Sequence, residues 1–295
     1  MPKIKRKHRN WVDAVYGDEK RGKVFVVVGG QYGSEAKGLF ASYLAKKENV
    51  DYAVRTGSIN AGHTVFYKGK AYKNQQIPVA WINPHTRLVI GAGAYVSPGV
   101  LEREIKMIEE ATGQSIKDRL FIDGRCGSQL PIHAEREAGL HERMGSTGEG
   151  VSEAIKDKMD RKFDYARFAG TPYAMRYKGK SYQEEDTVRA LNRAYDEGGT
   201  ILVEGTQGAL LDLHLSYYPF CTSRQTIAAS WLAEAGLSPN MNLEIAMICR
   251  TFPIRVAGNS GPMPNEVGWT DLLRSMNGAR LNRGLAPLVE EKYLI

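Results

Sequence analysis

The clearest pattern along the chain is an uninterrupted apolar run over residues 24–28, with the sequence VFVVV. A β-branched run of this length predicts a strand that is buried on both faces, as in a parallel sheet. A glycine-rich turn follows, and the pattern then predicts a helix over about 36–46. A strand, a glycine turn and a helix together point backbone N–H groups at an anion, usually a phosphate. The same pattern also fits a plain connection between a strand and a helix.

Short apolar segments alternate with helical ones as far as about residue 250. We predict strands at 52–55, 87–90, 120–122, 200–203 and 244–250, a hairpin at 65–73, and helices near 101–110, 133–144, after 154, near 184–197 and up to about 235. This alternation predicts a single α/β domain with a doubly wound, mostly parallel sheet over 23–295, preceded by a basic leader at 1–22. Its ligands are expected beyond the C-terminal ends of the strands.

Composition narrows the class of protein further. The chain has 295 residues, of which 42% are hydrophobic and 25% charged, as in soluble globular proteins. No apolar run is long enough to span a membrane, and the N-terminus lacks the apolar core of a signal peptide. The cysteines are odd in number and far apart in sequence (Cys126, Cys221 and Cys249), which is typical of free thiols in a reducing compartment. We therefore predict a cytoplasmic protein.

The net charge of +7 suits a protein that handles polyanions, and nucleotides and nucleic acids both qualify. Much of the excess lies in the leader, at Lys3, Lys5, Arg6, Lys7 and Arg9. A basic leader is usually a solvated tail. An arm that contacts DNA is the alternative, but the leader has few aromatic residues and no recognition helix follows it. We therefore expect neither nucleic-acid binding nor membrane binding.

Several common sites are excluded by spacing. His133 and His141 are eight residues apart, not the three or four that would place both on one metal ion. The chain has neither a G-x-S-x-G elbow nor a G-x-G-x-x-G turn with its acidic partner, so a serine hydrolase and a dinucleotide site lack support. Lys37 does not belong to a Walker A motif, because Ala36 precedes it and Gly38 follows it.

What remains is four turns rich in glycine, hydroxyl and amide groups, at 29–38, 56–64, 145–150 and 204–208. His63 lies in the second turn and Gln207 in the fourth. Each, taken alone, also fits an ordinary surface position. The glycines beside them allow a ligand to approach the backbone closely. The coincidence of these turns with strand ends therefore favours a binding site.

The motifs QYGSEAKG, NAGHT, GSTGEGVSEAIKDK, VEGTQGALLD, YPFCTS and RVAGNSGPMPNE occur in this order between residues 23 and 266. Together they resemble the adenylosuccinate synthetase family. The resemblance implies a ligase that uses a nucleoside triphosphate to phosphorylate the 6-oxo group of a purine monophosphate. The amine of L-aspartate then displaces the phosphate to form an N6-succinyl purine.

The resemblance also implies roles for individual residues. Those around the triphosphate are Gly33, Ser34, Glu35, Ala36, Lys37, Gly38, Gly62, His63 and Thr64. Those around the purine monophosphate are Ser34, Asn60, Ser146, Thr147, Arg161, Gln207, Leu211 and Thr222. Ser34, His63, Lys37 and Gln207 would be catalytic, with His63 as the general acid. Mg²⁺ would bind the Gly62 carbonyl and Ser34. In this family Arg161 would reach the 5′-phosphate of the neighbouring subunit, which implies a homodimer.

One departure from the family bears on the substrate. The family's first turn reads G-D-E-G-K-G, and Ser34 stands in place of its aspartate. A serine hydroxyl is a much weaker base than a carboxylate. It is also smaller, so it leaves room for a purine 2-amino group and can accept a hydrogen bond from it. A small residue here resembles the phage-type branch, the 2-aminoadenylosuccinate synthetases, which use dGMP. We therefore favour dGMP and, for a phage protein, the host cytoplasm.

A second departure lies near the C-terminus. In the family an arginine-rich loop that ends in Gly-Trp binds aspartate, and a later T-K-L-D motif reads the guanine of GTP. Here Asn265 and Glu266 are followed directly by Val267, Gly268 and Trp269, and no T-K-L-D motif occurs. The resemblance therefore implies Asn265, Gly268 and Trp269 as aspartate ligands and leaves part of the aspartate site unaccounted for. Selectivity for GTP loses its usual basis, and ATP or dATP is favoured, as in the phage-type branch. The alternatives are an ordinary adenylosuccinate synthetase that uses IMP and GTP, and a nucleotide-binding protein without catalysis.

Overall fold

The centre of the chain is a six-stranded sheet in which every pair of neighbouring strands is parallel. The structure is a computed structural model that describes residues 21–144, 146–162, 186–255, 260–263 and 267–288. The strand order is β10-β1-β9-β2-β5-β7. These strands span Lys23–Gly29 (β1), Tyr52–Arg55 (β2), Arg87–Ile90 (β5), Leu120–Ile122 (β7), Thr200–Glu204 (β9) and Leu243–Ile248 (β10). The prediction of a doubly wound, mostly parallel sheet is confirmed.

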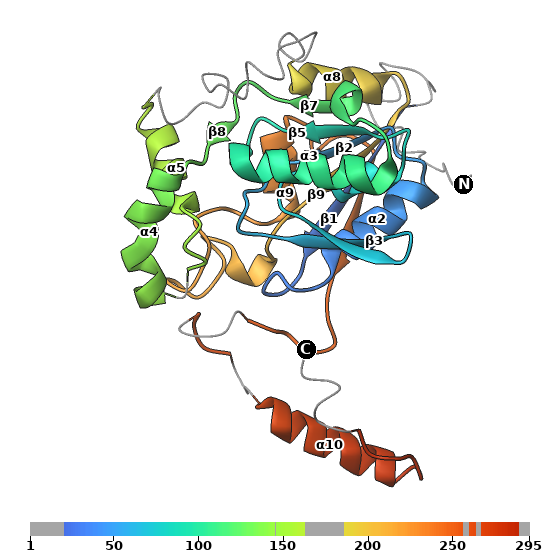
Figure 1. Cartoon of the computed structure of the whole chain (residues 1–295), viewed down its shortest axis with the longest axis vertical. Helices are drawn as coiled ribbons and strands as arrows, with labels where there is room; N and C mark the ends of the chain where they lie inside the picture. The colour runs from blue at the N-terminus through green and yellow to red at the C-terminus, as the bar shows by residue number, and fades with distance from the viewer. Residues whose placement is uncertain (1–20, 145, 163–185, 256–259, 264–266, 289–295) are drawn as a thin grey trace, which may run out of the picture.

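Helices cover both faces of this sheet (Figure 1). On one face, α2 (Lys37–Lys47) and α3 (Pro98–Thr112) pack on alternate strand residues such as Phe25 and Leu88. On the other face, α8 (Thr187–Asp196) and α9 (Ala228–Ala235) pack on the intervening residues, among them Val24, Val26 and Val203. Successive side chains of a strand point to opposite faces, so the apolar run of β1 belongs to two separate cores. The prediction that this strand is buried on both faces is confirmed.

The remaining elements lie around this central sheet. The predicted hairpin is formed by β3 (His63–Tyr67) and β4 (Lys70–Asn74). The short strands β6 (Tyr95–Val96) and β8 (Gly127–Ser128) pair in parallel and form a separate two-stranded sheet. Two further helices, α4 (Pro131–Met144) and α5 (Val151–Met159), pack against each other at one side of the sheet (Figure 1).

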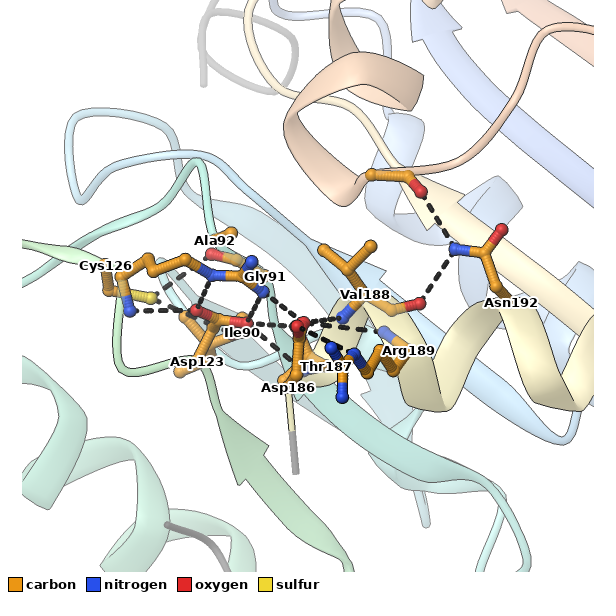
Figure 2. Close-up of polar contacts among 12 residues, drawn as sticks. Ile90, Gly91, Ala92, Asp123, Cys126, Asp186, Thr187, Val188, Arg189 and Asn192 are labelled. Atoms are coloured by element: carbon orange, nitrogen blue, oxygen red, sulfur yellow. Dashed lines mark hydrogen bonds and ion pairs between the residues drawn. The ribbon is translucent and has the colours of Figure 1, made fainter. Parts of the chain in front are cut away.

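The carboxylate of Asp123, directly after β7, ties the carboxyl end of that strand to the start of α8 (Figure 2). It accepts hydrogen bonds from Thr187 Oγ1, at 2.8 Å, and from the Arg125 side chain. Asp186 in turn accepts from the backbone N–H groups of Val188 and Arg189 and so caps α8. The cap explains why the helix begins at Thr187, a few residues later than the predicted 184.

Among the described α-helices, one was not predicted. It is α10 (Trp269–Leu281), which lies apart from the sheet and from the other helices (Figure 1). Leu281 is 61% exposed and Met276 is 40% exposed. Its apolar residues Leu272, Leu273 and Met276 do have helical spacing, so the sequence carried a signal for this helix that the prediction missed. No described helix is long and apolar enough to cross a membrane.

Candidate active site

Three of the four predicted turns follow strands that are neighbours in the sheet, β1, β9 and β2. Their backbones approach one another closely. A Cβ atom on Gly29, at the end of β1, would lie 2.5 Å from the carbonyl oxygen of Gln207, after β9. A Cβ atom on Gly38 would lie 2.6 Å from Cβ of His63, at the end of the loop after β2. Glycine is therefore required at both positions, because any side chain would separate the turns.

The turns enclose a cavity of about 370 Å³, a size typical of small-molecule sites. All four predicted turns contribute to its wall. The predicted residues that line it are Gly33, Ser34, Asn60, Gly62, His63, Ser146, Thr147, Gln207, Leu211 and Thr222. The fold thus brings together most of the residues that the sequence pointed to, from positions almost 190 residues apart.

His63 is held from behind by a buried carboxylate. Its Nδ1 atom lies 2.5 Å from Oε1 of Glu204, and Nη1 of Arg55 donates to the same oxygen at 2.8 Å. The other ring nitrogen, Nε2, is buried at the cavity wall and has no hydrogen-bond partner in the protein. Burial, together with the charge of Arg55, lowers the pKa of His63 to about 4. The imidazole is therefore neutral near pH 7.

The first turn holds a buried ion pair that does not line the cavity. Nζ of Lys37 lies 2.7 Å from Glu35 Oε2 and donates to the Gly33 carbonyl oxygen at 2.9 Å. The other Glu35 oxygen accepts from the backbone N–H groups of Gly33 and Gln31. Burial lowers the pKa of Lys37. The donors expected to grip a phosphate are thus bonded to the chain's own carboxylate, and Glu35, Ala36, Lys37, Gly38 and Thr64 do not line the cavity.

Gln207 lines the cavity, and its side-chain amide is hydrogen-bonded to two neighbouring side chains. Its backbone has φ 52°, in the left-handed region that non-glycine residues seldom adopt. Its side-chain nitrogen donates to Asn60 Oδ1 at 3.1 Å, and its oxygen accepts from Thr206 Oγ1 at 2.7 Å. Backbone strain of this kind is concentrated at functional sites, so the ordinary surface interpretation of Gln207 is disfavoured.

Several wall residues were not predicted from the sequence. Arg255 lies over the ring of Tyr32, 4.6 Å from its centroid, and donates to the backbone carbonyl oxygens of Phe220 and Pro262. Its Nε atom is buried without a partner. Arg255 lies within the motif RVAGNSGPMPNE and Phe220 within YPFCTS, so the motifs marked these segments without singling out the residues.

Glu137 on α4 fixes the third turn, at 145–150. Its carboxylate accepts from the Ser152 hydroxyl and from the backbone N–H groups of Gly150 and Ser152, at the start of α5. Ser146 and Thr147 belong to the loop that leads into this helix and line the cavity. Glu137 was missed because nothing in the sequence of α4 shows that it faces a loop ten or more residues away.

Three further predicted residues lie elsewhere, and a fourth lies outside the described residues. Arg161 follows α5, roughly 15 Å along the helix from Val151 at the cavity wall, and does not line the cavity. Gly268 immediately precedes α10 and Trp269 begins it, and neither lines the cavity. Asn265 lies outside the described residues.

The site offers oxygen ligands of the kind that Mg²⁺ prefers. The Ser34 hydroxyl and the Gly62 backbone belong to the same wall. Among the described residues, no group of three or more His, Cys, Asp or Glu side chains could hold a metal ion by itself. Mg²⁺ is usually bound by one or two protein oxygens together with waters and substrate phosphates. The residues present fit a magnesium ion of that kind.

A doubly wound α/β sheet with a cavity at the carboxyl ends of neighbouring strands defines a class of protein that binds a small ligand there. Residues 26–169 and 173–282 match the adenylosuccinate synthetase family model. The chain belongs to the adenylosuccinate synthetase family and is a C–N ligase of purine biosynthesis that binds nucleotides.

Known adenylosuccinate synthetases are similar over most of the chain. The enzyme of Methanococcus maripaludis is 37% identical over 246 residues, which make up 82% of this chain and 69% of the relative. The enzyme of Thermococcus onnurineus is 33% identical over 300 residues, 91% of this chain and 84% of the relative. The predicted resemblance to the family is confirmed.

Solved structures show the same fold. Succinoaminodeoxyadenylate synthetase (PurZ) of cyanophage S-2L, bound to dGMP and to dATP as an energy donor, superposes with a TM-score of 0.72 and 28% identity. The match covers 83% of this chain and 71% of that one. The fully ligated adenylosuccinate synthetase of Plasmodium falciparum has a TM-score of 0.66 at 20% identity, covers 88% and 69%, and shows likeness of fold alone.

Proposed function

We propose that the chain joins L-aspartate to C6 of dGMP, with hydrolysis of ATP or dATP. The product would be N6-succino-2-amino-2′-deoxyadenylate, for the synthesis of 2-aminoadenine DNA. The observation that carries the proposal is Ser34, which lines the cavity where the family's first turn has an aspartate. The phage S-2L enzyme, solved with dGMP and dATP, supports the same choice of substrates.

Arg250 supports the position of Ser34 at the wall. Its guanidinium donates to the Ser34 carbonyl oxygen at 3.2 Å, while its backbone N–H donates to the side chain of Gln31 at 2.8 Å. The serine thus belongs to a turn held from the end of β10. These contacts hold the backbone of Ser34 and leave its hydroxyl able to accept a hydrogen bond from a 2-amino group, whereas an aspartate would fill the space that this group needs.

The remaining residues fit the same reaction. In this proposal, Nε2 of His63 faces the phosphate that leaves, and Gln207 and Asn60 face the purine. The Glu35–Lys37 pair must open for Lys37 to contact a phosphate, because both charges now bind each other. Mg²⁺, held against Gly62 and Ser34, would neutralise charge on the phosphates. Phosphoryl transfer depends mainly on such positioning and charge neutralisation.

Arg161 supports the proposal of a homodimer. It is exposed, and it lies at the far end of α5 from the cavity of its own chain. A contact between this guanidinium and the 5′-phosphate would therefore have to come from a second subunit. In the same proposal, Asn265, Gly268 and Trp269 approach aspartate.

Two other functions compete with this one. An ordinary synthetase that uses IMP and GTP is favoured by the names of the archaeal relatives. A nucleotide-binding protein without catalysis would need only the cavity. The buried His63–Glu204 contact at the wall disfavours the second alternative, because simple binding does not need a histidine held by a carboxylate.

Aspartate-dependent phosphate release tests the proposal, measured with dGMP and IMP in combination with ATP, dATP and GTP. We expect kcat/KM to be at least about tenfold higher for dGMP than for IMP, as hydrogen bonding to a distinguishing group allows. Turnover of IMP without turnover of dGMP would overturn the proposal. A strict requirement for GTP would overturn the choice of ATP or dATP, and no phosphate release with either purine would favour the binding protein.

Two substitutions of Ser34 separate its size from its hydroxyl. Ser34→Asp should lower kcat/KM for dGMP roughly 100-fold, by filling the space beside C2, and should improve the relative use of IMP. Ser34→Ala keeps the space and removes only the acceptor, so it should retain dGMP as the preferred substrate with a smaller loss. Equal preference for dGMP in all three proteins would show that Ser34 does not select the substrate.

A further inference from the structure

The Glu204 carboxylate is fully buried and completely engaged. Oε1 contacts both Nη1 of Arg55 and Nδ1 of His63, and Oε2 accepts from the backbone N–H of Val79 at 2.8 Å. A carboxylate paired with a guanidinium is ionised and can only accept hydrogen bonds. The proton between Glu204 and His63 must therefore belong to Nδ1 of the histidine.

This contact determines what His63 presents to the cavity. A neutral imidazole carries one N–H, so a proton held on Nδ1 leaves a lone pair on Nε2. Nε2 is the buried nitrogen that lies at the wall without a partner. Rotation of the ring would place Nε2 against Glu204 and would break this arrangement.

Arg55 makes the arrangement specific. It neutralises Glu204, and its second terminal nitrogen donates to the carbonyl oxygen of Ala61. Arg55 ends β2 and Glu204 ends β9, two paired neighbours in the sheet, and His63 begins β3. A single carboxylate thus joins the histidine loop to the rigid sheet. Rigid elements hold functional groups more accurately than loops do.

We propose that Glu204 is the positioning residue of His63: it holds the ring by Nδ1 and so keeps Nε2 directed at the reacting phosphate. In the resting protein Nε2 has no proton to donate, so His63 acts as the general acid only after Nε2 takes up a proton, which the approach of the anionic phosphates favours. Glu204 acts through the histidine and does not touch substrate. This inference rests on the proposed role of His63 in the ligase reaction. It adds a residue, and a tautomer, that neither the motifs nor the relatives assign to the site.

The tautomer can be measured on the unaltered protein by ¹⁵N NMR of histidine side chains near pH 7, because protonated and lone-pair ring nitrogens have well-separated resonances. The signal of His63, assigned by its loss in His63→Asn, should show a proton on Nδ1 and a lone pair on Nε2. A proton on Nε2 would overturn the inference. This measurement does not require turnover, so it remains decisive if the proposed substrates are wrong.

Kinetics supply the second test, with Glu204→Gln, His63→Ala and the double variant. An amide in place of the carboxylate can turn the histidine to the wrong tautomer, which in a related arrangement is costly to kcat. We expect Glu204→Gln to lower kcat roughly 100-fold or more while KM for dGMP stays within about threefold. In the His63→Ala background the same substitution should have almost no further effect on kcat.

Glu104→Gln is the matched control, because Glu104 is a buried carboxylate that accepts from the backbone of residues 75–77 and does not line the cavity. Its kcat should stay within about threefold of wild type. Additive losses of kcat in the double variant, or an equal loss in Glu104→Gln, would show a merely structural role for Glu204. If Glu204→Gln does not fold, the tautomer measured on wild type decides.

Discussion

At the scale of single residues, two buried histidines are held by carboxylates in different ways. His63 contacts Glu204 at the cavity wall, whereas His133 on α4 lies away from the cavity and contacts Asp157 on α5 through Nε2, at 3.2 Å. Nδ1 of His133 accepts from the backbone N–H of Leu130 at 3.0 Å. This acceptor role requires a neutral ring, because a protonated imidazole can only donate.

We predict that His133 makes folding sensitive to mild acid. Burial lowers the pKa of His133, although Asp157 opposes the shift. Since the unfolded chain then binds the proton more readily, stability is complete above the ordinary pKa and falls as the pH drops below about 6.5. Urea unfolding at pH 7 and pH 5 should show a smaller loss of stability in His133→Gln than in wild type. Exposed His85 is the control, and His85→Gln should keep the wild-type loss.

The residue scale also shows the limits of motif matching. Ser34, Asn60, His63 and Gln207 were predicted by motif and all line one cavity. Glu204 belongs to a quoted motif too, yet its role depends on the contact with His63, 141 positions away. No local pattern encodes such a distance in sequence. Lys37 illustrates the opposite case, since the motif indicates a phosphate ligand and the structure pairs it with Glu35.

At the scale of elements, the start of α2 carries a local strain. Ala36 precedes this helix with φ 66°, where the family's turn has a glycine. An alanine in the left-handed region costs roughly 1–2 kcal/mol, because its Cβ crowds the following carbonyl oxygen. The closely packed turns around it hold the conformation in place.

We predict that Ala36→Gly stabilises the protein by roughly 0.5–1 kcal/mol, since relief of strain exceeds the extra entropy of an unfolded glycine. The side chain of Ala36 is exposed, so no packing is lost. Urea unfolding should show a higher midpoint with an unchanged slope. Ala45→Gly, the same exchange at a buried position of α2, should instead destabilise by about 1 kcal/mol or more. A lower midpoint for Ala36→Gly would contradict the prediction.

Elements with strong periodicity were predicted well and weakly buried ones were not. The strand at 24–28 and the helix near 101–110 each have a buried stripe that their spacing reveals. The unpredicted α10 exposes most of its apolar side chains, and the paired β6 and β8 have two residues each. The two-residue strands depend on tertiary contacts, which leave little periodic signal, whereas the spacing of Leu272, Leu273 and Met276 in α10 is helical and was missed.

At the scale of the whole molecule, the proposed homodimer makes a quantitative prediction. His63→Ala and Arg161→Ala should each be nearly inactive alone. If Arg161 acts on the neighbouring site, a mixed dimer contains one site with both groups intact. Random exchange makes about half of the dimers mixed, so a 1:1 mixture should recover about a quarter of wild-type activity.

The measurement is phosphate release after the two variants are co-expressed or allowed to exchange subunits. A mixture of His63→Ala with His63→Gln is the control and should recover nothing. Native mass should be about twice the 32.7 kDa of one chain. Absence of recovery in a mixture shown to contain mixed dimers would mean that Arg161 acts within its own chain or not at all.

The amino-acid sequence alone determined the order of strands and helices, the parallel sheet and the family, because apolar periodicity and short motifs are local properties of the chain. It also determined that Ser34 replaces an aspartate. Only the tertiary structure decided which side chains meet. It brought Arg55 and His63, from two separate segments, to the carboxylate of Glu204. It also paired Lys37 with Glu35 and placed Arg161 at the far end of α5 from the cavity. The first of these outcomes depends on the pairing of β9 with β2, and contacts across a sheet leave no local signal in the sequence.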